Sequence, residues 1–209
     1  MTLSHTGASE LAQLMEGTTA GASAIKRSMV LRSIGVGAGC GQHGHGLSLR
    51  AMVNAAALIE RYGLQPHPEG GWYRELHRSA LEVQRSDGEA RSALTLILFL
   101  LDGASLSRWH RVSGADETWQ FIGGDPLELV LLSPDGDTAT RLQIGFSPTD
   151  PAPTPVAVVP AGWWQAARSL GVWSLVSCCV GPGFSFADFA LLADLPARDW
   201  PAGVLEEFV

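Results

Sequence analysis

The chain has 209 residues, of which 46% are hydrophobic and 17% charged, and its net charge is −7 at pH 7. This composition supports a packed domain rather than a disordered chain. Residues 1–51 hold two acidic and four basic residues, so the rest carries 19 acids and 10 arginines, a net charge of −9. An acidic domain repels phosphate backbones and anionic lipid surfaces, so we expect neither nucleic acid nor a membrane as partner.

The three cysteines are Cys40, Cys178 and Cys179. They form neither a disulfide framework nor a CxxC pair typical of zinc sites, so we expect free thiols and a cytoplasmic location. The longest strongly apolar run, residues 93–101, is far shorter than the roughly 20 residues of a membrane helix. The N-terminus shows no secretory signal pattern.

Residues 1–51 differ in composition from the rest of the chain. They are rich in Gly, Ser, Ala and Thr and contain no aromatic residue. We expect a low-complexity, disordered extension here, followed by one domain over residues 52–209. Because the foldable sequence begins at Met52, we also hypothesise that translation starts at this methionine.

The elements that follow are short. Residues 54–62 predict a helix with Asn54 as N-cap and Gly63 as its stop. Two prolines and two glycines between Pro66 and Gly71 predict a shaped loop. A strand is predicted over residues 72–83, and further strands, separated by turn signals, over 93–101, 106–112, 118–122, 127–132, 139–144, 156–159, 163–167 and 172–180, with a closing segment at 184–192. Roughly ten short strands and one helix predict an all-β sandwich or barrel.

Alternation along these strands places polar side chains in the interior. Side chains two residues apart share a face of a strand. This predicts one face with Leu106, Arg108, His110 and Val112, and an opposite face with Ser107, Trp109 and Arg111. On the next strand Glu117, Trp119 and Phe121 share a face, and Trp163 and Gln165 follow the turn at residues 160–162. An imidazole, a carboxylate, an amide and aromatic rings inside a barrel are typical of a small-molecule pocket.

These residues resemble the cupin superfamily, whose motifs are G(x)5HxH(x)3–4E(x)6G and G(x)5PxG(x)2H(x)3N. His110, Glu117 and Gly124 match the first motif, and residues 160–162, PAG, match the second. The segments HPEGGWYRE at 67–75, VVPAGWWQAA at 158–167 and SLVSCCVGPGFSFADF at 174–189 resemble one largely uncharacterised, single-domain cupin family. The resemblance covers residues 54–193. It implies a double-stranded β-helix, the cupin jelly-roll barrel, a homodimer, and similarity in shape to deoxysugar epimerases and sugar isomerases.

The sequence departs from the metal-binding cupin pattern at two positions. Val112 stands where the motif has its second histidine, and Gln165 stands where it has the late histidine. This leaves His110, Glu117 and the Gln165 amide as candidate ligands, and valine cannot coordinate a metal. We therefore expect no cofactor and no redox iron, while a weakly held divalent metal remains open.

Without a metal, His110 and Glu117 could transfer protons, with Tyr73 as an acid. The sequence therefore predicts a metal-independent epimerase or isomerase acting on a sugar or nucleotide sugar. The alternatives are a cupin that binds a small ligand without turnover, a weakly metal-binding cupin enzyme, and a His110–Glu117 pair that only satisfies a polar core. Arg74 and Arg108 are predicted to hold a phosphate or carboxylate group of the ligand. The full set of residues predicted to bind the ligand is His67, Glu69, Arg74, Arg108, Trp119, Phe121, Trp163 and Gln165.

Overall fold

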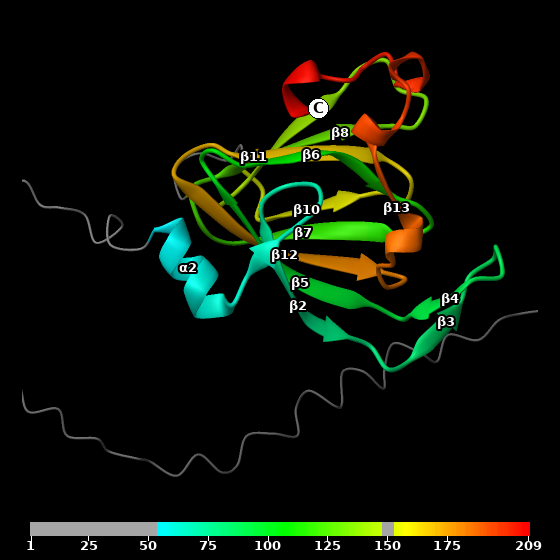
Figure 1. The fold of residues 1–209 in the computed structure, drawn as a ribbon, viewed down its shortest axis with the longest axis horizontal. Helices are drawn as coiled ribbons and strands as arrows, with labels where there is room; N and C mark the ends of the chain where they lie inside the picture. Colours follow the sequence, from blue (N-terminus) through cyan, green and yellow to red (C-terminus); the bar gives the residue numbers. More distant parts are fainter. Residues whose placement is uncertain (1–53, 148–152) are drawn as a thin grey trace, which may run out of the picture. The chain divides into compact units, whose positions relative to one another are not determined.

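The computed structural model describes residues 54–147 and 153–209. The predicted disordered extension, residues 1–51, and the proposed start at Met52 lie outside the described residues. Within the described part, the sequence folds into one short α-helix, many strands and several 3₁₀ turns (Figure 1). No helix in this part is long and apolar enough to cross a bilayer.

The helix α2, Ala55–Tyr62, ends where its capping residues predict. The side chain of Asn54 accepts a hydrogen bond from Ala57 N at 2.8 Å and so satisfies one of the free N–H groups of the first turn. Gly63 adopts φ 60°, the left-handed conformation of a C-terminal glycine cap. The predicted helix and both of its caps are confirmed.

Two antiparallel sheets face each other and form the jelly-roll barrel that the sequence predicts. One sheet has the order β1-β2-β5-β12-β7-β10 and the other the order β13-β6-β11-β8-β9 (Figure 1). The strands are β1 (Gln65–Pro66), β2 (Trp72–Arg78), β3 (Glu82–Gln84), β4 (Ala90–Ser92), β5 (Thr95–Asp102), β6 (Leu106–Val112), β7 (Asp116–Gly124), β8 (Leu127–Leu132), β9 (Thr140–Ile144), β10 (Val156–Val159), β11 (Trp164–Ser169), β12 (Trp173–Gly181) and β13 (Phe189–Leu191).

One predicted strand is wrong. The segment 72–83 is not continuous: β2 ends at Arg78, and β3 pairs with β4 in a separate hairpin. The chain leaves the large sheet because Ser79 N donates to Leu94 O and Ala93 N donates to Leu81 O, which closes a small loop before the hairpin. In Figure 1 this hairpin extends beyond the ends of β2 and β5.

The apolar core fills one part of the space between the two sheets. Its members from the first sheet include Phe99, Trp119 and Val176, and those from the second include Leu129 and Ile144. A second cluster lies on the outer face of the five-stranded sheet, where the C-terminal turns η3 (Leu192–Asp194), η4 (Ala197–Asp199) and η5 (Glu206–Phe208) cover it. The rest of the space between the sheets is lined by both polar and aromatic side chains.

Two β-bulges change which residues face that space. On β2, Glu75 pairs with Ile97 and His77 with Leu96, so Leu76 is an extra residue. The prediction that alternation continues through the strand therefore fails at this point.

The second bulge lies on β6. His110 and Ser107 are three residues apart, yet they pair with Gln165 and Ala167, which are two apart. Ser107 and His110 therefore lie on the same face, and the predicted placement of Ser107 opposite His110 is wrong. The extra residue of the bulge restores the same face after three positions instead of two.

Candidate functional site

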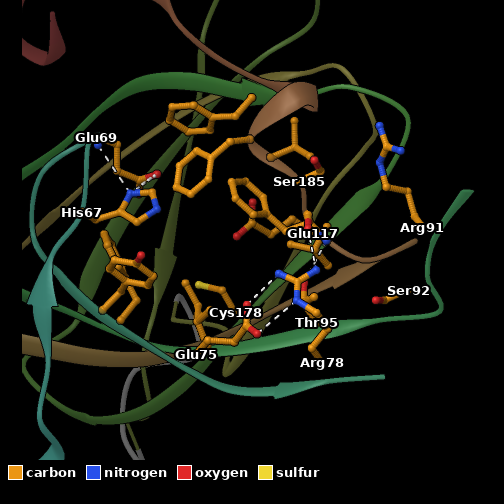
Figure 2. A pocket seen from close by; sticks show the side chains of 18 of the residues that line it. His67, Glu69, Glu75, Arg78, Arg91, Ser92, Thr95, Glu117, Cys178 and Ser185 are labelled. Carbon is orange, nitrogen blue, oxygen red and sulfur yellow. Dashed lines mark hydrogen bonds and ion pairs between the residues drawn. The ribbon is translucent and has the colours of Figure 1, made fainter. Parts of the chain in front are cut away.

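A cavity of about 580 Å³ lies between the sheets at the end that the apolar core leaves open. Its volume falls in the range of small-molecule sites. Aromatic rings form much of its wall, and polar groups reach it from the loop before β2, from strands that include β2, β4, β5, β6, β7 and β12, and from the segment after β12 (Figure 2). The aromatic lining residues are Tyr73, Phe99, Trp119, Phe184, Phe186 and Phe189.

The HPEGG loop places His67 and Glu69 in this cavity. Gly70 has φ 111°, and a Cβ there would lie 2.0 Å from Leu106 O, so only glycine permits this close approach to β6. Arg108 fixes the loop from the other side, since its Nη2 donates to Pro68 O at 2.7 Å and its backbone N donates to Glu69 O at 2.9 Å. The loop therefore determines where the Glu69 carboxylate lies.

The Glu69 carboxylate is buried and joins three side chains. Its Oε1 accepts a hydrogen bond from Ser107 Oγ at 2.8 Å. Its Oε2 lies 3.1 Å from His67 Nδ1 and 3.3 Å from His110 Nε2. His67 Nδ1 also lies 3.4 Å from the Glu69 backbone N, but the shorter contact with the charged carboxylate is the stronger interaction. Glu69 is thus the common partner of both histidines.

The hydrogen bonds of His110 indicate its protonation state. Its Nδ1 lies 2.8 Å from Arg108 O, and a carbonyl oxygen can only accept, so Nδ1 carries a proton. Its Nε2 faces the Glu69 carboxylate, which also accepts when ionised. Both contacts are favourable only when Nε2 is protonated as well. Both ring nitrogens of His110 thus face acceptor oxygens, and an imidazolium at this position would pair with the Glu69 carboxylate.

Glu117 has different partners. Its Oε2 accepts a hydrogen bond from Gln165 Nε2 at 2.6 Å, and Gln165 Oε1 accepts from Trp119 Nε1 at 2.8 Å. Burial raises the pKa of the Cys178 thiol well above its ordinary value, and the charge of Glu117 adds to this effect. The predicted direct His110–Glu117 pair is therefore replaced by two separate pairs, His110 with Glu69 and Glu117 with Gln165.

The two buried carboxyl groups have pKa values shifted in opposite directions. Burial raises the pKa of Glu117, and the charge of Glu69 adds to this effect, although the charge of His110 opposes it. Burial also acts to raise the pKa of Glu69, but the charge of His110 and the hydrogen bond from His67 outweigh it and lower the pKa. One cavity thus contains a carboxylate that stays ionised and a carboxyl group that retains its proton more readily.

The cavity brings together six of the residues predicted to form the site: His67, Glu69, Tyr73, His110, Glu117 and Trp119. Five others do not line it. Phe121 and Trp163 pack against the apolar core, and Gln165 lies behind Glu117 as its hydrogen-bond donor.

The two arginines predicted to hold an anion also lie outside the lining. Arg74 donates from Nη1 to Tyr62 O at 2.9 Å, at the end of α2. Arg108 holds the HPEGG loop through Pro68 O and Glu69 O. Both side chains are therefore used for structure.

Sequence reasoning missed several residues of the site. Arg78, which lines the cavity, and Ser107, which donates to Glu69, reach their positions through the two bulges, which no local pattern reveals. Thr95 and Cys178 lie on strands that read as continuous apolar runs. Phe189 comes from β13, and its ring stacks on His110 with centroids 5.6 Å apart. The PGFSFADF resemblance pointed to this last segment without assigning it to the cavity.

The residues at the cupin metal positions do not fit a divalent ion. Val112 has no donor atom, and both polar atoms of the Gln165 amide already bond to Trp119 and Glu117. Among the described residues, no group of three or more His, Cys, Asp or Glu side chains could hold a metal. The predicted fallback ligand set of His110, Glu117 and Gln165 is therefore not assembled as a metal site.

The solved structures that are similar to this chain include the following two. A hypothetical protein from Leishmania major is 34% identical with a TM-score of 0.61, over 66% of this chain and 86% of that one. A protein from Shewanella oneidensis is 36% identical with a TM-score of 0.61, over 68% of this chain and 85% of that one. No match was found among curated proteins.

Residues 56–192 match the family described as "Cupin superfamily (DUF985)". This range spans the helix, both sheets and the segment up to the start of η3. It contains every residue that was predicted for the site. The chain therefore belongs to the DUF985 family of the cupin superfamily.

Proposed function

We propose that this cupin binds a small sugar derivative in its cavity and catalyses metal-independent proton transfer on it, as an epimerase or isomerase does. The observation that carries the proposal is the pair of buried carboxyl groups that face one cavity with pKa values shifted apart. Such a pair provides separate acid and base functions at one pH. No cofactor is required for this chemistry.

Glu117 acts as the base, His110 acts as the acid, and Glu69 orients His110. In its ionised form Glu117 removes a proton from the carbon next to a substrate carbonyl, and its raised pKa makes it a stronger base than an ordinary glutamate. The electrons of the C–H bond form a C=C bond, and the carbonyl oxygen takes a proton from the His110 imidazolium. Glu69 orients His110 and stabilises its charge.

The second half of the reaction returns the protons. For epimerisation, His110 recovers its proton from the enol oxygen, Tyr73 protonates the carbon from the opposite face, and solvent then returns a proton to Tyr73 and takes one from Glu117. For isomerisation of a substrate with a hydroxyl group on the carbon that lost its proton, His110 instead takes its proton from that hydroxyl, whose oxygen becomes the new carbonyl oxygen, and Glu117 returns its proton to the former carbonyl carbon. Tyr73 lines the cavity, with its ring 4.6 Å from that of His67.

Solvent deuterium exchange tests this proposal. Hexoses, hexose phosphates and nucleotide sugars are incubated with the protein in D₂O, and loss of the C–H proton next to the carbonyl is followed by NMR. We expect exchange with the wild type and at least about a hundredfold loss in Glu117→Gln and in His110→Asn. His77→Asn is the matched control, because His77 does not line the cavity. Exchange that survives in both cavity variants would contradict the assigned roles.

A second candidate, binding without turnover, is favoured by one observation. The chain Trp119–Gln165–Glu117 satisfies its polar groups internally, as a purely structural network would. A ligand that raises the melting temperature of the protein but shows no deuterium exchange would support this candidate.

A further inference from the structure

The cavity changes in chemical character from its buried end to its exposed end. At the buried end, the side chains of Glu69 and His110 are 7% and 2% exposed. At the other end, the side chain of Arg78 is 44% exposed. Figure 2 shows Glu69 and His67 on one side of the cavity and Arg78, with Glu75, on another. The two ends can therefore bind different parts of one ligand.

The β2 bulge is what turns Arg78 into the cavity. Tyr73 pairs with Phe99, Glu75 with Ile97 and, after the extra residue, Arg78 with Thr95. All six of these residues line the cavity. Regular alternation would instead have directed His77 inward, so the irregularity exchanges an imidazole for a guanidinium at this position.

The Arg78 guanidinium is held in place but retains free donors. Its Nε and Nη2 donate to the Glu75 carboxylate at 3.1 and 2.7 Å, and its Nη1 donates to Phe184 O at 2.9 Å. A guanidinium has five N–H donors, so two remain beyond these three. Arg91 also lines the cavity, but four of its five donors are committed to Asp188, Glu89 and Ala90 O, so one remains. Arg78 is therefore the guanidinium with more donors for a ligand.

Hydroxyl groups extend the set of donors around Arg78. Thr95 Oγ1 accepts from Phe184 N at 2.9 Å, and Ser185 Oγ accepts from Ala187 N at 3.3 Å. Because both oxygens act as acceptors in these bonds, their own protons can be donated to a ligand. Ser92 lines the same part of the cavity. A guanidinium together with hydroxyl donors suits the oxygens of a phosphate group.

We infer that the exposed end of the cavity binds a phosphate group of the ligand through Arg78, Thr95 and Ser185, while the ring of that ligand lies at the buried end. The opposite orientation would bring the phosphate against the Glu69 carboxylate. Glu75 orients the guanidinium but also competes with the phosphate for it. The substrate class is thus a phosphorylated small molecule, which specifies the ligand of the proposed function and rests on the same cavity.

The test is calorimetric titration with phenyl phosphate, phenol and inorganic phosphate. We expect phenyl phosphate to bind at least tenfold more tightly than phenol. Arg78→Gln should lower the affinity for phenyl phosphate about tenfold and leave the affinity for phenol unchanged. Glu75→Gln should strengthen phenyl phosphate binding, because it removes a competing charge and the amide oxygen can replace only one of the two acceptor oxygens. Arg74→Gln is the matched control, since this arginine lies on the same strand outside the cavity.

The outcomes separate this inference from the proposed catalysis. Equal affinity of Arg78→Gln and the wild type for phenyl phosphate would overturn it, and so would an equal loss in Arg74→Gln. The opposite effects of the Arg78 and Glu75 variants keep the test informative if one variant folds poorly. His110→Asn and Glu117→Gln should still bind phenyl phosphate. A wild-type protein that binds phenyl phosphate normally but shows no deuterium exchange with any of the sugars would refute the catalysis alone.

Discussion

Replacement of Glu69 by glutamine tests the central network of the cavity. Glutamine has the same shape, and its oxygen can still accept the hydrogen bond from Ser107. The contacts with His67 at 3.1 Å and His110 at 3.3 Å lose their negative partner. At about 1.5 kcal/mol for each charge-assisted contact, we expect the free energy of unfolding to fall by about 3 kcal/mol at pH 7.

The dependence on pH follows from the lowered pKa of Glu69. A carboxyl whose pKa is lower in the folded state contributes stability above its unfolded value of 4.5 and loses it as the pH falls through the folded value. The difference between the wild type and Glu69→Gln should therefore be largest near neutrality and shrink below pH 4.5. Urea denaturation across this pH range measures the difference. Glu75→Gln is the control, because it removes a carboxylate from an ion pair that is exposed. A loss below about 1 kcal/mol, or one that is constant with pH, would refute the reasoning.

Three further predictions concern other parts of the structure. Because the pKa of Glu117 is raised, the wild type should lose stability relative to Glu117→Gln as the pH rises above 4.5, measured by urea midpoints; the opposite trend contradicts the assigned shift. Gly70→Ala should cost at least about 2 kcal/mol, since its Cβ meets Leu106 O at a backbone conformation that favours glycine. Phe208→Ala should cost about 3 kcal/mol in thermal unfolding, because this ring packs against Trp109 beneath the C-terminal turns.

The sequence predicts most of the architecture, because the local signals agree with the fold. The helix 54–62 has both of its caps, and the strands 106–112, 127–132 and 156–159 have the predicted bounds. The jelly-roll class is confirmed by the two facing antiparallel sheets. The homodimer, the cytoplasmic location and the absence of a cofactor stay predictions.

The site is predictable only in part. His110 and Glu117 both line the cavity, as the motif implies. The sequence pattern predicts that they pair with each other, whereas in the structure each has a different partner. The choice of Glu69 as the partner of His110 depends on a loop whose shape is set by contacts with β6, about 40 residues away along the chain, as in the Ser107–Glu69 hydrogen bond. Spacing within a single motif cannot reveal such a contact.

The β2 bulge leads to a last prediction, on how Arg78 reaches the cavity. Leu76 is the extra residue, so its deletion leaves Glu75 opposite Ile97 and Arg78 opposite Thr95. We therefore expect the Leu76 deletion to fold and to bind phenyl phosphate within about threefold of the wild type, a change of less than 1 kcal/mol. If the Leu76 deletion loses binding, the bulge itself, and not only the register, positions Arg78.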